Sequence, residues 1–241
     1  PQSARIKTFS HDAQTTDSAP SMAAYTTGVK MNNEVIAMSS DTRAVAPSKD
    51  ANGNKGINNC TSDNGSPVPT ILELAKAAGK SVGAVTTTEL THATPAATYS
   101  HICHRDAAYA IAEQAVPGGA GFNQALGDGV DVLMGGGANH WTPYSASNKG
   151  GRADGRDLTA ELTARGYRYV TTKDELSAVN SGKVLGLFST KSHLDYELDR
   201  VAKGAASTQP SLSEMTAKAI DLLSQNSQGY FLMVEGGRID H

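Results

Sequence analysis

The chain has 241 residues, which is enough for one large domain or two small ones with a substantial buried core. Hydrophobic residues make up 39% and charged residues 19%, the composition of an ordinary soluble globular protein. A formal net charge of −3 argues against general nucleic-acid binding, and no apolar run reaches the roughly 18 residues that span a membrane.

Helices and strands are expected to alternate along the chain, and this alternation predicts an α/β fold with a largely parallel central sheet. Ligand sites in such sheets gather at the carboxyl ends of the strands. Polar residues predict long surface loops at 41–68 and 141–157 and a third polar connection at 199–210. Helices are expected at 18–28, within 71–80 with an end just before Gly79, at 106–116 and at 158–166. A short helix should begin with a Thr172/Glu175 capping box, and another with a Ser211/Glu214 capping box. Strands are expected at 81–87, 130–134, 183–188 and 230–235.

The segment 17–28, DSAPSMAAYTTG, carries the first candidate site. Its helix should start near Ser18, with Pro20 in the first turn, where a missing N–H is no loss. Free amides at a helix start bind phosphate well, so Ser18 would lie beside an anion site. The alternative is an ordinary helix cap made by Asp17 or Ser18.

Two polar segments follow the expected strand 81–87. His92 and Thr94 would point the same way if their segment were extended, so that an imidazole and a hydroxyl could share one metal ion. Arg105 leads into the next helix and could present its planar fork to a phosphate group. The alternatives are a solvated loop around His92 and a surface pairing of Arg105 with Asp106 or another carboxylate.

The segment 235–241, EGGRIDH, follows the last apolar strand. A carboxylate that ends an apolar strand is costly unless a cationic group meets it. Glu235 and Asp240 are therefore candidate ligands of adjacent metal ions, with His241 beside them; a solvated turn is the alternative. The glycines 135–137 lack the G-x-G-x-x-G pattern and the P-loop Lys-Ser/Thr, so we expect a tight turn there.

Cys60 and Cys103 are the two cysteines of the chain. A buried reduced pair and a single disulfide of an exported protein both fit this count. Neither residue lies in a spacing typical of zinc ligands.

Taken together and in order, these segments resemble the alkaline phosphatase family from about residue 9 to residue 241. The resemblance rests on DSAPSMAAYTTGVK, on TILELAKAAGKSVGAVTTTELTHATPAATYSH, on Arg105, on DVLMGGGAN, on the LGLF block and on FLMVEGGRIDH. It implies a three-layer sandwich, of which residues 1–241 would be a partial catalytic domain that lacks N-terminal and C-terminal parts.

The resemblance also implies a role for each matching residue. Ser18 would be the nucleophile that becomes phosphoserine and also a metal ligand, Arg105 would bind phosphate, and Asp17 would orient Arg105. Thr94 and Glu235 would hold Mg²⁺ with His92 nearby, Asp240 would hold one of two Zn²⁺ ions, and His241 would lie near the incoming phosphate. The implied substrates are small-molecule phosphate monoesters hydrolysed at alkaline pH, by a periplasmic or secreted homodimer.

Some features depart from the family pattern. No secretory leader is visible, and the other zinc ligands of the family would lie before Pro1 and beyond His241, so both zinc sites are expected to be incomplete in this chain. Ser189 occupies a position that is acidic in the calcium site of animal members, so calcium is not expected. The alternatives are a phosphodiesterase or sulfatase on the same scaffold, a non-catalytic fragment that binds phosphate or one metal, and a nucleotide-binding domain built on glycines 135–137.

Overall fold

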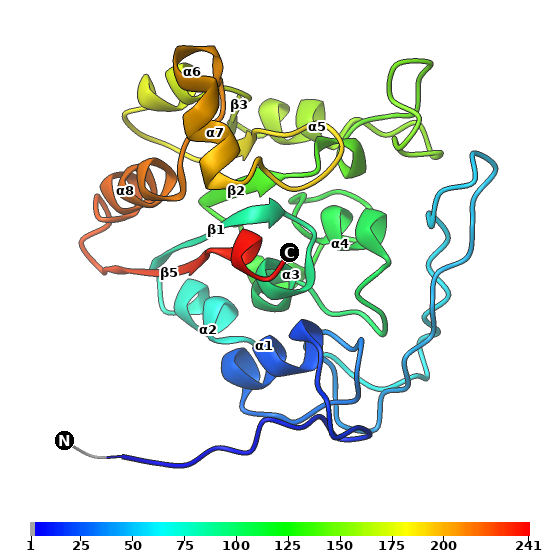
Figure 1. Cartoon of the computed structure of the whole chain (residues 1–241). Coiled ribbons are helices and arrows are strands. Elements are labelled where there is room, and N and C mark those ends of the chain that lie inside the picture. Colours follow the sequence, from blue (N-terminus) through cyan, green and yellow to red (C-terminus); the bar gives the residue numbers. More distant parts are fainter. Residues whose placement is uncertain (1–2) are drawn as a thin grey trace.

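A five-stranded parallel sheet forms the centre of the computed structural model, which describes residues 3–241 (Figure 1). The strand order is β3-β4-β2-β1-β5, and every neighbouring pair is parallel. The expected α/β class and parallel sheet are therefore confirmed. The strands are β1 (Ser81–Glu89), β2 (Val132–Gly136), β3 (Arg168–Val170), β4 (Val184–Leu187) and β5 (Tyr230–Glu235).

Helices cover both faces of this sheet, which gives the three-layer sandwich. In Figure 1, α1, α2 and α3 lie on one side of β1, and α6 and α8 lie on the other. The helices are α1 (Ser18–Thr27), α2 (Ile71–Ala77), α3 (Ala93–Tyr99), α4 (Ala108–Gln114), α5 (Leu158–Ala164), α6 (Lys173–Ser177), α7 (Glu197–Lys203) and α8 (Leu212–Leu223), and four single 3₁₀ turns are η1 (Gln124–Leu126), η2 (Ala138–His140), η3 (Gly204–Ala206) and η4 (Gly237–Ile239).

Alternation along the strands divides the buried side chains between two cores. Val82 and Ala84 of β1 join the core under α1 to α5, whereas Val85 joins the core under α6 and α8. In β2, Leu133 and Met134 divide in the same way. Successive side chains of a strand point to opposite faces, so a sheet covered on both sides needs apolar residues at consecutive positions.

Helix caps follow the sequence signals closely. The expected capping boxes at Thr172/Glu175 and Ser211/Glu214 are present, and Gly79 has the expected left-handed conformation just past α2. Thr70 also forms a capping box at the start of α2. Each cap satisfies backbone N–H groups that the helix leaves free, at about 1 kcal/mol per cap.

Three expectations about secondary structure are wrong. The stretch 199–210 is not a continuous loop, because α7 and η3 extend through it as far as Ala206. The helix expected at 106–116 is shorter, because Ala107 caps it. Glycines 135–137 do not form one turn: β2 continues to Gly136, where a Cβ would lie 2.3 Å from the carbonyl oxygen of Ser192, and the left-handed turn occurs at Gly137.

The long loop 41–68 is tied to the rest of the molecule by a disulfide bond. Cys60 and Cys103 are bonded, with their Cα atoms 5.7 Å apart. This decides between the two states that the sequence left open. The bond fixes the backbone two residues before Arg105, and so it supports a candidate site residue.

Candidate active site

Ser18 lies at the first residue of α1, and Asp17 caps this helix. One carboxylate oxygen of Asp17 accepts a hydrogen bond from the Ala19 N–H at 2.7 Å. Pro20 has no N–H, and the Ser21 N–H points to the Asp17 carbonyl at 3.4 Å. Asp17 therefore takes two of the amides that were expected to be free at this helix start, and the Ser18 N–H is not one of them. An anion beside Ser18 would need further hydrogen-bond donors from another segment.

Arg105 supplies such donors. Its Nη1 donates to the Ser18 hydroxyl oxygen at 2.7 Å and to the Asp17 carboxylate at 3.1 Å. The second Asp17 oxygen accepts from the Glu34 N–H at 2.7 Å, and the Arg105 N–H donates to the Glu34 carbonyl at 2.8 Å. Asp17, Ser18 and Arg105, which we call the Ser18 group, thus form a closed hydrogen-bonded set.

The backbone around the Ser18 group is held in an unusual conformation. Glu34 has a φ of 69°, which is uncommon for a residue other than glycine. Hydrogen bonds to its N–H and its carbonyl hold it there, and Ile36 pairs with Ile102 in both directions just beyond. Strained residues of this kind persist only where the surroundings determine them, and they are often found at functional sites.

His92 connects the end of β1 to the Ser18 group. Its Nε2 accepts a hydrogen bond from Arg105 Nη2 at 3.0 Å. Burial, followed by the positive charge of Arg105, lowers the pKa of His92 to about 3, so the ring is neutral near pH 7. The expected extended segment is wrong: His92 caps α3, and Thr94 lies in its first turn. Pro95 suits that turn because its missing N–H would be unpaired there.

His193 and His241 lie against His92, and His193 was not predicted as a site residue. The ring centroids are 5.3 Å apart for His92 and His193, 5.4 Å for His92 and His241, and 4.5 Å for His193 and His241. Burial, and then the neighbouring His241, lower the pKa of His193 to about 4. His193 follows β4, so its place just past the end of an expected strand was the signal that could have found it.

Glu235 lies at the end of β5. Its Oε2 accepts hydrogen bonds from the Thr86 hydroxyl at 2.6 Å and the Thr88 hydroxyl at 3.2 Å. These two hydroxyl groups of β1 hold the carboxylate in place. Asp240 is exposed. Within residues 3–241, no hydrogen bond or ion pair joins Thr94, Glu235 or Asp240 to the Ser18 group.

The chemistry of these side chains suits divalent cations. Thr94, Glu235 and Asp240 offer oxygen atoms, which Mg²⁺ prefers, and carboxylate and imidazole ligands suit Zn²⁺. His92 Nδ1 is buried and lacks a hydrogen-bond partner among the described residues. The residues present therefore fit a site for divalent cations.

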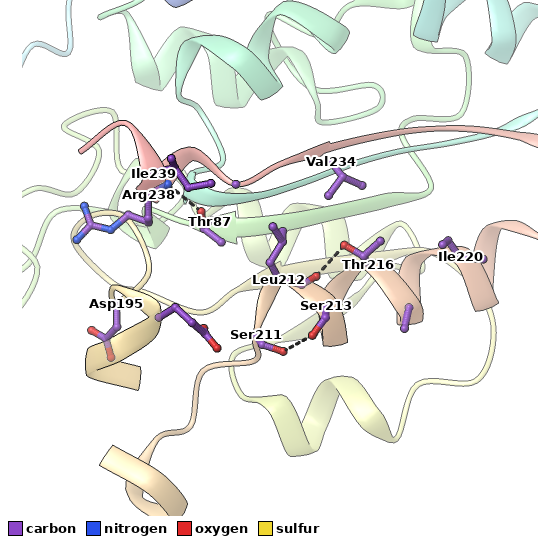
Figure 2. A pocket seen from close by; sticks show the side chains of 13 residues that line it. Thr87, Asp195, Ser211, Leu212, Ser213, Thr216, Ile220, Val234, Arg238 and Ile239 are labelled. Atoms are coloured by element: carbon purple, nitrogen blue, oxygen red, sulfur yellow. Dashed lines mark hydrogen bonds between the residues drawn. The ribbon is translucent and has the colours of Figure 1, made fainter. Parts of the chain in front are cut away.

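One groove of the molecule is apolar and is not lined by the Ser18 group. It occupies about 700 Å³ between the end of β5 and α8, and Figure 2 shows Leu212, Ile220, Val234 and Ile239 along it. A second pocket of about 310 Å³ is more polar, and Arg105 and His92 line it. Ser18 is not among the residues that line it, so this pocket borders the candidate site on the side of Arg105 and His92.

Comparison with known proteins agrees with this geometry. The family model described as "Alkaline phosphatase" matches residues 1–241. The chain belongs to the alkaline phosphatase family. It is 37% identical to the tissue-nonspecific isozyme of Gallus gallus over 265 residues, which cover 100% of this chain and 47% of that protein. It is 38% identical to the alkaline phosphatase of Gadus morhua over 257 residues, which cover 98% and 50%.

Solved alkaline phosphatases share the fold. The enzyme of Thermus thermophilus superposes with a TM-score of 0.76 at 34% identity and covers 98% of this chain and 41% of that one. The cold-active enzyme of Shewanella sp. gives 0.71 at 30% identity, covering 97% and 46%. This chain of the alkaline phosphatase family thus spans about half the length of the curated relatives it matches. In residues 3–241, none of the helices has both the length and the apolar character to cross a membrane.

Proposed function

We propose that this chain carries the nucleophile and the phosphate-binding arginine of a metal-dependent phosphomonoesterase. The observation that carries the proposal is the closed Ser18 group, in which a guanidinium touches a hydroxyl at a helix start. The family relationship supports the same reaction. Residues 1–241 would form part of a catalytic domain that is about twice as long in the relatives.

Ser18 would attack the phosphorus of a phosphate monoester through its side-chain oxygen. The alcohol would leave with a proton, and water would then release phosphate from the phosphoserine. A serine hydroxyl is a weak nucleophile unless a neighbour stabilises its deprotonated form. The Arg105 guanidinium, 2.7 Å from the Ser18 oxygen, favours negative charge at that atom.

Arg105 would also hold the phosphate oxygens, and Asp17 would hold Arg105. A guanidinium presents parallel N–H donors that match phosphate geometry. Asp17 fixes one side of that fork through Nη1, and it is itself fixed by two backbone N–H groups. These contacts bind the phosphate group and not the alcohol, so we expect the protein to hydrolyse a broad range of phosphate monoesters.

Metal ions would complete the site. Thr94, Glu235 and His92 would surround Mg²⁺, and Ser18, Asp240 and ligands from other parts of the protein would hold two Zn²⁺ ions, with His241 near the phosphate. One solved relative, a mutant of the enzyme from the Antarctic bacterium TAB5, has Mg bound in its M3 site. When bound, such ions stabilise negative charge on the attacking and leaving oxygens.

The remaining proposals concern the protein as a whole. The Cys60–Cys103 disulfide supports a periplasmic or secreted location, because such bonds persist in oxidising compartments. A homodimer is proposed from the family relationship.

Replacement of Ser18 tests the proposed function. In the full-length protein loaded with zinc and magnesium, Ser18→Ala should reduce phosphomonoester hydrolysis at alkaline pH to background. Ser21→Ala is the matched control, because Ser21 lies in the same first turn and its hydroxyl donates only to the Asp17 carbonyl. Near-normal turnover by Ser18→Ala would overturn the proposal, as would faster hydrolysis of phosphodiesters or sulfate esters by the unchanged protein.

A further inference from the structure

Three histidines from distant parts of the chain meet beside Arg105. His92 follows β1, His193 follows β4, and His241 follows η4. One ring nitrogen of each lies within 4.8 Å of the others, a spacing that a metal ion could bridge. Their hydrogen bonds decide whether they can do so, because a neutral imidazole binds a metal only through the nitrogen that carries no hydrogen.

The backbone fixes the hydrogen of His193. The N–H of Glu89 donates to His193 Nδ1 at 2.9 Å. A backbone N–H can only donate, so Nδ1 must accept, and the hydrogen of the neutral ring lies on Nε2. Metal-binding histidines show the opposite pattern, in which the second nitrogen donates to a carbonyl or carboxylate. His193 therefore presents an N–H group where a metal ligand would present a lone pair.

The other two histidines differ from His193. His241 Nδ1 lies 3.0 Å from the Gly237 carbonyl, which can only accept, so His241 keeps a lone pair on Nε2. His92 accepts from Arg105 at Nε2, so its hydrogen lies on the buried Nδ1. Rotation of the Arg105 side chain could free His92, but the Glu89 backbone cannot become an acceptor. The three rings thus do not form a three-nitrogen metal site.

We propose that His193 is a hydrogen-bond donor to the phosphate group and not a metal ligand. The partner of its Nε2–H must be an acceptor, and the site proposed above brings a dianion beside Arg105 and His241. Hydrogen bonds from an N–H to an ionised oxygen are about twice as strong as neutral ones. This inference rests on the proposed function, and it adds a phosphate contact from the loop after β4 to those from α1 and from Arg105.

Two variants distinguish the role of His193 Nδ1 as an acceptor from the role of Nε2 as a donor. In His193→Asn, the amide oxygen can take the place of Nδ1 and accept from Glu89, but the Nε2–H is lost. In His193→Gln, the longer side chain can return an N–H to the position of Nε2. His11→Asn is the matched control, because His11 is exposed and bonds through Nδ1 to Asn32.

The experiment measures binding of inorganic phosphate and metal content in the full-length protein loaded with zinc and magnesium. We expect His193→Asn to weaken phosphate binding about ten-fold or more, which is the scale of one charge-assisted hydrogen bond. Zinc and magnesium per subunit, measured by mass spectrometry, should be unchanged. His193→Gln should recover most of the phosphate affinity, and His11→Asn should match the unchanged protein.

Two results would overturn the assignment of His193. One is a loss of bound metal in His193→Asn, which would make His193 a ligand. The other is unchanged phosphate affinity in His193→Asn while Ser18→Ala is inactive; that result would leave the proposed function intact. If the unchanged protein bound no phosphate and hydrolysed no monoester, the proposed function would fail, and this assignment would fail with it.

Discussion

Two halves of the candidate site differ in how completely the protein builds them. The Ser18 group is closed by hydrogen bonds between 2.7 and 3.1 Å, and the Glu34 backbone and a disulfide support it. Within residues 3–241, the oxygen donors Thr94, Glu235 and Asp240 make no hydrogen bond or ion pair with that group, and Asp240 is exposed. Donors fixed by backbone and helix caps need no ligand to be in place, whereas carboxylates that repel one another need a cation to bring them together.

Metal removal should give the largest effect, because Ser18 and the oxygen donors would all lose the ions proposed above. After dialysis of the full-length protein against a chelator, we expect phosphomonoester hydrolysis to fall to background and to return with zinc and magnesium. The hydrogen bonds of the Ser18 group join protein atoms, so the fold should persist and the far-ultraviolet circular dichroism should be unchanged at room temperature. Activity that survived chelation would contradict the division of the site into two halves.

Loss of the disulfide should give the next largest effect, since it acts on the support of the Ser18 group. The bond closes a loop with a sequence separation of 43 residues, for which the chain-entropy model gives about 4 kcal/mol. We expect the Cys60→Ala, Cys103→Ala double variant to lose about 2–4 kcal/mol of unfolding free energy in a denaturant titration. Unchanged stability would show that the segment leading to Arg105 is held by other contacts.

Arg105→Ala tests the Ser18 group directly. Removal of the guanidinium should weaken inhibition by inorganic phosphate by about 1.5–3 kcal/mol, the scale of a charge-assisted hydrogen bond. Arg105→Lys keeps the charge but loses the planar fork, so it should recover only part of that affinity. Equal phosphate inhibition constants for Arg105→Ala and the unchanged protein would count against the arginine as a phosphate ligand.

Acid should slightly weaken the contacts of Glu73, which closes the capping box of α2. Burial acts to raise the pKa of Glu73, but hydrogen bonds from His101, at 2.6 Å, and Asn123 outweigh it and lower this pKa. A lowered pKa means that the carboxylate stabilises the fold above its ordinary pKa of 4.5, and this contribution is lost as the pH falls through the folded-state value.

The Glu73→Gln variant tests whether Glu73 contributes to the loss of folding stability as the pH falls. Unfolding free energies measured at a series of pH values below neutrality should fall less steeply for Glu73→Gln than for the unchanged protein. Glu175→Gln offers a comparison, because Glu175 also closes a capping box but lies far more exposed. If the unfolding free energies of Glu73→Gln and the unchanged protein fell equally with pH, Glu73 would not be the source of this pH dependence.

The sequence predicted those features that local patterns determine. Apolar runs located β1, β4 and β5, and side-chain caps located the starts of α6 and α8. The Ser18 and Arg105 segments were predicted as well, because an unusual helix start and a matching family pattern coincide there. The pairing of Cys60 with Cys103 was not decided by the sequence, since it depends on where the loop 41–68 folds back.

Features that depend on contacts between distant segments were missed. His193 follows an ordinary polar loop, and only the fold brings it to His92 and to the Glu89 backbone. The two hydroxyl groups that bond to Glu235 were not predicted, because the threonines that carry them lie on the neighbouring strand β1. A single sequence without contacts cannot specify the register that pairs Thr86 with Glu235.

The most direct test of the central claim is to locate the phosphoryl group on the protein. The full-length enzyme, loaded with zinc and magnesium, would be incubated with a phosphate monoester, quenched in acid and digested, and the peptides mapped by mass spectrometry. We predict a single phosphorylated residue, Ser18, that disappears in Ser18→Ala and remains in Ser21→Ala. A phosphoryl group on another residue, or turnover with none trapped under any quench condition, would contradict the account.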